Sequence, residues 1–186
     1  MILETPRLRL RPFAPGDRAA LRRLVREKEA GPESAWDYAW PTDDAGLRNV
    51  SEWIERSDAF FAVCLREGPE RDPIGFVSIT PENAGTVCNL GYFLSPRHRG
   101  HGFAFEACAE PLRYAFDVLG ADRAAAGTAV ANLPSVRLLG RLGFTPSGPD
   151  QEGSLRRSPA GEPIRFLGRS FTLERAEWAE AVNRVR

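Results

Sequence analysis

The chain has little lysine, no net charge and no long apolar run, and each of these shortages excludes a class of protein. Lysine occurs once, at Lys28, among 25 basic residues, and 25 acidic residues bring the formal net charge to zero. A neutral chain lacks the general basic field that nucleic acid or an anionic membrane would require. No run of about 18 apolar residues occurs, and the opening segment 1–7 lacks the basic region and long apolar run of a signal peptide. The sequence therefore predicts a cytoplasmic protein with no membrane or stable nucleic-acid partner.

Cysteine and histidine are also scarce. The three cysteines, Cys64, Cys88 and Cys108, show no paired spacing, and the only histidines are His98 and His101. Disulfide-stabilised secreted domains have paired cysteines, and metal sites need clustered ligands. We therefore expect reduced, mostly buried thiols and no metal site.

What is present is typical of one globular domain over residues 1–186, because 42% of its side chains are hydrophobic and its length suffices for a sizeable core. Apolar periodicity, capping residues and Gly/Pro turns predict the order β-α-α-β-β-β-α-β-α-β, an α+β fold with helices on both faces of a sheet. The predicted strands are 7–11, 60–65, 74–80, 87–94, 124–130 and 164–173, and the predicted helices are 17–29, 45–56, 102–119, 132–142 and 173–185. A polar loop is expected over 147–163.

The junction between strand 87–94 and the following helix is the most informative stretch. It reads Arg-His-Arg-Gly-His-Gly-Phe-Ala over 97–104. Gly100 and Gly102 allow close approach of a bulky ligand to the backbone, and the N-terminus of a helix presents unpaired N–H groups and a positive dipole end. Together with Arg97 and Arg99, this turn favours a pyrophosphate.

Two other interpretations of this turn exist. A dinucleotide-binding turn of the form G-x-G-x-x-G needs a small third residue, and that place holds Phe105, although Asp122 follows at the distance where that fold puts its ribose-binding acid. The turn could also simply connect a strand and a helix without a ligand. The preceding strands resemble a meander rather than a β-α-β unit, which disfavours the dinucleotide.

Two longer patterns point to a family. Arg97-x-x-Gly100-x-Gly102, followed by Ala104-x-Glu106-Ala107, resembles motif A of the GNAT superfamily of acyl-CoA-dependent N-acetyltransferases. The segment 132–144, Asn-Leu-Pro-Ser…Leu-Gly-Phe, is similar to that superfamily's second motif, and the segments 4–11 and 90–94 resemble its ribosomal-protein-alanine (Rim-type) subgroup. The resemblance covers about residues 4–146, and the C-terminal strand and helix over 164–185 would complete the domain.

The resemblance implies a mixed, mostly antiparallel sheet with a splayed cleft between strands 87–94 and 124–130, where acetyl-CoA binds as cosubstrate without a metal. A backbone N–H near Phe93 or Leu94 would polarise the thioester carbonyl. The cofactor-binding residues it implies are Phe93, Leu94, Arg97, His98, Arg99, Gly100, His101, Gly102, Phe103, Ala104, Asn132 and Ser135.

The resemblance also gives roles to three polar residues. Ser135 would protonate the departing thiolate, and Asn132 would bind the pantetheine arm, although both residue types are equally typical of a helix start. Asn89 stands where Rim-like relatives often carry a carboxylate base; an amide cannot be a base but can orient water or substrate. Asp150 and Glu152 are alternative bases.

The acceptor is expected to be a protein N-terminus or a small-molecule amine, attacking directly in a ternary complex. Trp36, Tyr38 and Trp40 would either pack in the core or form an aromatic wall for this acceptor. Position 89 holds an amide rather than a carboxylate, and no tyrosine is found at a place matching the one that many GNAT enzymes use to protonate the thiolate. These two departures leave a second hypothesis, a catalytically degenerate acyl-CoA-binding module. A homodimer is a further hypothesis.

Overall fold

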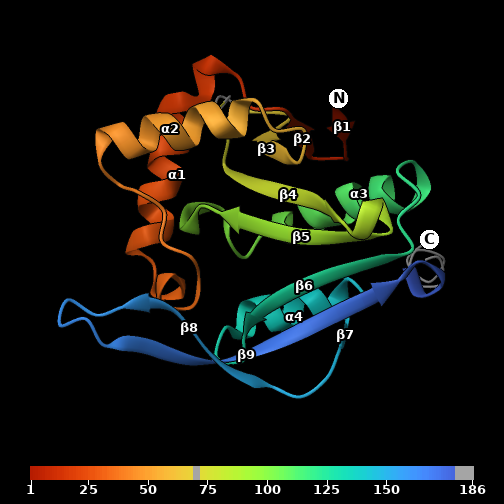
Figure 1. Ribbon diagram of the computed structural model, residues 1–186. Coiled ribbons are helices and arrows are strands. Elements are labelled where there is room, and N and C mark those ends of the chain that lie inside the picture. The colour runs from red at the N-terminus through yellow and green to blue at the C-terminus, as the bar shows by residue number, and fades with distance from the viewer. Residues whose placement is uncertain (69–71, 179–186) are drawn as a thin grey trace.

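The computed structural model describes residues 1–68 and 72–178, and its nine strands form one sheet (Figure 1). The strand order is β1-β2-β3-β4-β5-β6-β9-β7, and β8 pairs with β9. All neighbouring strands run antiparallel except β5 and β6, which run parallel. The strands are β1 Leu3–Glu4, β2 Leu8–Arg11, β3 Phe60–Leu65, β4 Gly75–Glu82, β5 Val87–Leu94, β6 Arg123–Ala129, β7 Thr145–Pro146, β8 Gln151–Arg157 and β9 Pro163–Glu174. The α+β class expected from the sequence is confirmed.

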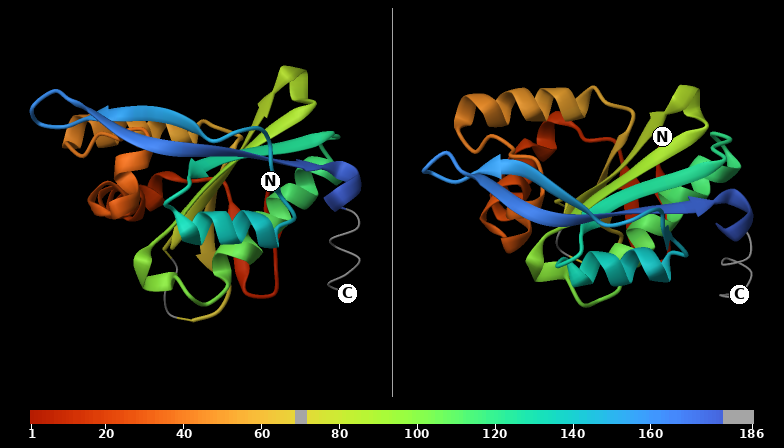
Figure 2. Two further views of the ribbon diagram at one scale, coloured as in Figure 1. Left: turned by 90° about the horizontal axis from the view of Figure 1, so that it is seen from below. Right: turned by 60° about the horizontal axis from the view of Figure 1, so that its bottom comes forward.

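Helices cover both faces of the sheet, as Figure 2 shows. The longer ones are α1 Arg18–Ala30, α2 Asp44–Glu55, α3 Phe103–Asp117 and α4 Leu133–Arg141. Leu24 of α1 and Ile54 of α2 belong to a core on one face, while Leu112 of α3 and Leu139 of α4 belong to the larger core on the other. Short 3-10 turns complete the chain: η1 Pro15–Asp17, η2 Pro32–Trp36, η3 Asn83–Gly85 and η4 Pro96–His98. Among the described residues, no helix combines the length and hydropathy needed to cross a bilayer.

Several elements match the sequence prediction closely. Strands β3 and β5 have the predicted bounds. Helix α2 starts behind Asp43, whose carboxylate accepts a hydrogen bond of 2.9 Å from the Gly46 N–H, as a capping residue should. The three cysteines are free and buried, as expected.

Two local features differ from the simplest expectation. Asp17, which the sequence suggests could either cap α1 or add negative charge at its start, makes no capping hydrogen bond to α1; its carboxylate accepts hydrogen bonds from the Ala14 N–H and from Arg11, at 2.8 and 2.6 Å. The predicted loop over 147–163 contains β8, which pairs with the first half of β9 in a hairpin. The C-terminal helix begins at residue 175 rather than 173, and its predicted continuation past residue 178 lies outside the described residues.

The feature that positions the site is the separation of β5 and β6. The two strands pair only over their first residues, from Val87↔Arg123 to Asn89↔Ala125. Beyond Asn89, β5 continues to Leu94 against β4, and β6 continues to Ala129 against β9. The sheet therefore splays open between the second halves of its two parallel strands, as the resemblance implies (Figure 1).

Candidate active site

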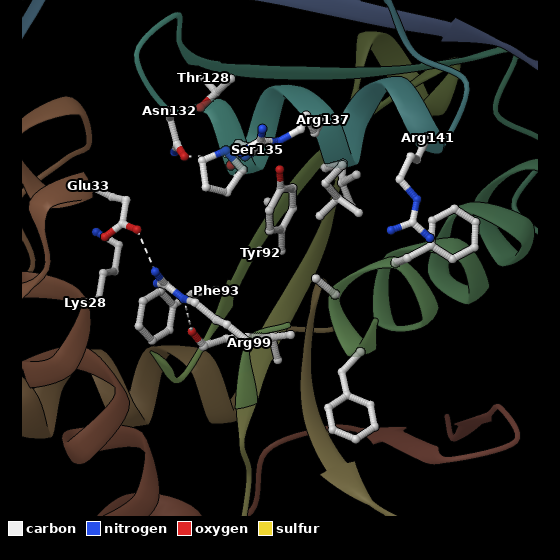
Figure 3. A pocket seen from close by; sticks show the side chains of 18 of the residues that line it. Lys28, Glu33, Tyr92, Phe93, Arg99, Thr128, Asn132, Ser135, Arg137 and Arg141 are labelled. Carbon is white, nitrogen blue, oxygen red and sulfur yellow. Dashed lines mark hydrogen bonds and ion pairs between the residues drawn. The ribbon is translucent and has the colours of Figure 1, made fainter. Parts of the chain in front are cut away.

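A cavity of about 640 Å³ occupies the splayed region. The ends of β5 and β6 form part of its wall, and the glycine turn, the first turns of α3 and α4, and η2 complete it (Figure 3). The lining residues used below are Lys28, Glu33, Trp36, Asp37, Tyr92, Phe93, Leu94, His98, Arg99, Gly100, Gly102, Phe103, Ala104, Thr128, Asn132, Ser135, Arg137 and Arg141.

The glycine turn has the backbone shape that its residues predict. Gly100 and Gly102 adopt φ values of 83° and 80°, in the left-handed region that favours glycine. A Cβ atom on Gly100 would meet no heavy atom within 4 Å, so the space beside this residue is open. Helix α3 begins immediately afterwards at Phe103, and its first N–H groups have no intrahelical acceptor. The turn is therefore an open cradle of N–H donors at a helix N-terminus, which suits an anion.

Glu106 fixes this turn to the N-terminal segment. Its carboxylate accepts hydrogen bonds from the Thr5 hydroxyl at 2.5 Å, the Arg7 backbone N–H at 2.8 Å and the Arg7 side chain at 2.7 Å. Arg7 also donates to the His101 carbonyl at 2.9 Å and lies over the Phe103 ring. Burial raises the pKa of Glu106, but these hydrogen bonds together lower it below its ordinary value. Glu106 thus has a structural role, because it joins the start of α3 to the N-terminal segment.

Three arginines give the cavity its positive charge. Arg99 comes from the turn, and Arg137 and Arg141 lie one helical turn apart on α4 (Figure 3). The two arginines of α4 were not among the residues expected from the sequence, although their i, i+4 spacing was a readable signal. Arg141 lies over the Phe105 ring, 4.9 Å from its centroid. Arg97, an expected cofactor residue, is exposed and does not line the cavity.

The expected residues of α4 do meet at the cavity. The Asn132 side-chain Oδ1 accepts a hydrogen bond from the Ser135 N–H at 3.4 Å, so Asn132 caps the helix as well as lining the site. The Tyr92 hydroxyl points from β5 toward Ser135 (Figure 3). Burial raises the pKa of Tyr92 well above its ordinary value, although the interaction with Ser135 acts in the opposite direction. Tyr92 is therefore a protonated hydroxyl beside Ser135, a position that was not expected from the sequence.

The exposed edge of β5 has free backbone donors. The Ser95 N–H donates to the Ile74 carbonyl at 2.9 Å, and hydrogen bonding alternates along an antiparallel pair. Phe93 accordingly directs its N–H to β4, whereas Tyr92 and Leu94 direct theirs to the opposite edge, where β6 has separated. Of the two expected carbonyl-polarising positions, the register thus favours the Leu94 N–H.

The opposite end of the cavity is lined by carboxylates from the region after α1. Glu33 forms an ion pair with Arg99, at 2.7 Å, and Asp37 forms one with Lys28, at 2.8 Å. Trp36 also lines the cavity. Neither Glu33 nor Asp37 was foreseen, because nothing in their sequence context places them opposite the glycine turn.

Three polar residues were considered for the role of the general base: Asn89, at the position where Rim-like relatives often carry a carboxylate, and the alternatives Asp150 and Glu152. They do not line the cavity. Asn89 donates from its side-chain amide to Glu82 at 2.8 Å, Asp150 pairs with Arg169 at 2.6 Å, and Glu152 pairs with Arg165 at 3.4 Å. The three aromatic residues between α1 and α2 lie in different environments. Trp40 stacks on Phe76 at the core with ring centroids 5.4 Å apart, Tyr38 is exposed, and Trp36 lines the cavity.

Comparison with known proteins agrees with this geometry. The family model of the acetyltransferase (GNAT) domain matches residues 7–145. The uncharacterized protein YkkB of Bacillus subtilis is 30% identical over 148 residues, which cover 76% of this chain and 84% of YkkB.

Two solved structures share the fold. A GNAT-family acetyltransferase from Bacillus anthracis superposes with a TM-score of 0.76 at 19% identity, covering 95% of this chain and 99% of that one. Spermidine N-acetyltransferase from Vibrio cholerae, solved with CoA and spermine, gives 0.74 at 16% identity, covering 94% and 99%. The family match extends from β2 to β7 and so includes the splayed strands, the glycine turn and α4. The chain belongs to the GNAT family of acetyltransferases.

Proposed function

We propose that this acetyltransferase moves an acetyl group from acetyl-CoA to an amine by direct attack in a ternary complex. The observation that carries the proposal is the separation of β5 from β6 beyond Asn89, with a cavity between the two strands that ends at the glycine turn. An extended pantetheine arm fits such a gap, because the free edge of β5 offers it backbone hydrogen bonds.

The positive end of the cavity supports binding of the CoA phosphates. The backbone of 100–104 offers N–H donors at a helix N-terminus, and Arg99, Arg137 and Arg141 supply guanidinium groups that pair well with phosphate oxygens. His98 and Asn132 line the same cavity, and Asn132 would bind the pantetheine arm. Arg97 would contribute positive charge near the turn without direct contact, and the backbone of His101 would belong to the turn, since neither residue lines the cavity.

The reacting end is assigned to β5 and α4. The Leu94 N–H would polarise the thioester carbonyl as negative charge develops on its oxygen. The acceptor ammonium first gives one proton to water, and the neutral amine then forms a C–N bond to that carbon and gives a second proton to water as the C–S bond breaks. Ser135 would give its proton to the departing thiolate and take one from the Tyr92 hydroxyl beside it, and water would return a proton to Tyr92, which burial keeps in its protonated form.

Direct attack, rather than an acyl-enzyme, fits the state of the cysteines. None of Cys64, Cys88 and Cys108 lines the cavity, and all three are buried. Burial raises the pKa of each thiol, that of Cys88 to about 11. A protonated thiol is a poor nucleophile, so these residues are core side chains.

The acceptor is an amine that binds at the end lined by Glu33, Asp37 and Trp36. Carboxylates there favour an acceptor that arrives as an ammonium ion, whether a protein N-terminus or a small-molecule amine. The Rim-like segments 4–11 and 90–94 favour the peptide amine within this class.

The test is thiol release from acetyl-CoA, measured across polyamines, aminoglycosides and peptides with free or blocked N-termini. We expect release with at least one free amine and none with the blocked peptides. Binding of CoA without turnover on any acceptor would instead favour the degenerate acyl-CoA-binding module. Failure to bind CoA would contradict both.

A further inference from the structure

Arg99 joins the two ends of the cavity. Its Nη1 donates to Glu33 Oε1 at 2.7 Å, and its Nε donates to the Leu94 carbonyl at 3.3 Å (Figure 3). Its guanidinium also lies 5.8 Å from the centroid of the Phe93 ring. Arg99 belongs to the glycine turn that would hold the donor, whereas Glu33 belongs to η2 at the acceptor end. One side chain therefore links the places where the two substrates would bind.

This link is easy to break. The side chains of Arg99 and Glu33 are 41% and 28% exposed, so water screens their attraction, and exposed ion pairs of this kind contribute little to stability. A pyrophosphate in the cradle beside Gly100 would offer Arg99 several charged oxygens within a geometry that a guanidinium matches bidentately. The pyrophosphate and Glu33 thus compete for the same group, and the pyrophosphate is the stronger partner.

If the Arg99 side chain turned to the pyrophosphate, the Glu33 carboxylate at the acceptor end would have no cation beside it. Lys28 does not replace Arg99, because its ammonium is held by Asp37 at 2.8 Å and lies over the Trp40 ring. Glu33 lies on η2 and lines the cavity together with Trp36 and Asp37. A carboxylate there that has lost its cation is a binding group for an ammonium ion.

We infer that Arg99 exchanges Glu33 for the pyrophosphate of the donor, so that donor binding releases the Glu33 carboxylate to hold the ammonium group of the acceptor. This inference rests on the proposed function, because it requires CoA at the glycine turn. It makes Glu33 the residue that selects a cationic acceptor, and it couples acceptor binding to the presence of the donor.

The exchange is testable without knowing the acceptor. CoA would be titrated calorimetrically into the wild type, E33Q, R99Q and the double variant. Removing the competing carboxylate should make E33Q bind CoA about two- to fivefold more tightly, the range expected for an exposed ion pair. R99Q should bind about tenfold more weakly. In the R99Q background the E33Q change should have no effect, since Arg99 is no longer there to be released.

The matched control is E52Q, which removes the same charge from an exposed glutamate paired with Arg56 on α2, outside the cavity. It should leave the CoA affinity unchanged. If the wild type binds CoA but E33Q does so equally or more weakly, the exchange is contradicted while the proposed function stands. If the E33Q change raises the CoA affinity equally in the wild-type and R99Q backgrounds, the gain comes from removing a negative charge and not from an exchange by Arg99, which contradicts the inference. If the wild type binds no CoA, the proposed function itself fails.

A second measurement addresses the acceptor half of the inference. With the best amine from the thiol-release panel, E33Q should raise KM for that amine about tenfold or more while the KM for acetyl-CoA falls or stays constant. Opposite movement of the two constants is not expected from a general loss of structure. An unchanged KM for the amine would contradict the role of Glu33 as its binding group.

Discussion

Arg156 of β8 donates two hydrogen bonds to the Glu29 carboxylate at the end of α1, at 2.7 and 3.0 Å. It also donates to the backbone carbonyls of Asp37 and Tyr38, at 2.7 and 3.0 Å. The Arg156 and Glu29 side chains are only 15% and 11% exposed. One arginine thus holds the β8–β9 hairpin against the segment that lines the acceptor end of the cavity.

Replacing this arginine should loosen the acceptor end. R156A leaves the Glu29 carboxylate largely buried without its main partner, and we expect a loss of about 3 kcal/mol in the free energy of unfolding, measured by denaturant titration. KM for the amine should rise, while the CoA affinity stays within about twofold of wild type because the glycine turn is untouched. R157A is the control, since Arg157 donates a hydrogen bond to the Gly161 carbonyl within the same hairpin and forms no ion pair across the described part of the chain. Equal effects of the two variants would contradict the role of Arg156.

Glu106 should make the fold sensitive to acid. Its pKa is lowered in the folded state from an ordinary value of 4.5, so its contribution to stability is fully present above that pH. The contribution is lost as the pH falls through the lowered folded-state pKa. E106Q should cost about 2 kcal/mol at neutral pH and should flatten the decline in unfolding free energy between about pH 5 and pH 3. The exposed Glu162, replaced by Gln, should leave that curve unchanged; an equally steep decline in E106Q would refute the assignment.

Ser135 and Tyr92 should affect the chemical step rather than donor binding. We expect S135A to lower kcat about 100-fold and Y92F about tenfold, with little change in the CoA affinity, because each removes a hydroxyl from the proposed proton path. Y114F, which removes a tyrosine hydroxyl from α3 outside the cavity, should retain wild-type kcat. Since burial raises the pKa of Tyr92 above its ordinary value of 10.0, kcat should show no loss from tyrosine ionisation up to that pH. A tyrosine-dependent fall in kcat below pH 9, absent in Y92F, would contradict this assignment.

The parts of the fold that the sequence predicted well are those fixed by local signals. The apolar strand 87–94 and a helix start near Asp43 or Asp44 depend on neighbouring residues; the structure confirms the strand, and it shows Asp43 as the capping residue of α2. Strand β8 was missed because its residues, Gln-Glu-Gly-Ser-Leu-Arg-Arg, have no apolar alternation. Its strand conformation depends on pairing with β9 and on the contact of Arg156 with Glu29, 127 residues earlier.

In the candidate site, too, the residues that could be predicted are those with a local sequence signal. The glycine turn and the helix start at Asn132 were readable because each is a continuous segment with a specific backbone requirement. Glu33 and Tyr92 were not, since an isolated glutamate and a strand tyrosine acquire a role only when the fold places them opposite Arg99 and Ser135. The donor end could therefore be inferred from sequence, whereas the acceptor end required the tertiary structure.

The central claim is that the open cradle at the glycine turn binds CoA, and calorimetric titration of CoA into the wild type, G100A and G148A tests it most directly. Gly100 and Gly148 have similar φ values of 83° and 90°, and a Cβ atom on either would meet nothing within 4 Å. Both variants should therefore lose a similar amount of stability, about 1 kcal/mol, from backbone strain alone. Only G100A places a methyl group at the cradle, so we predict tight CoA binding by the wild type and G148A and at least about tenfold weaker binding by G100A. No CoA binding by the wild type, or equal affinities in G100A and G148A, would contradict the account.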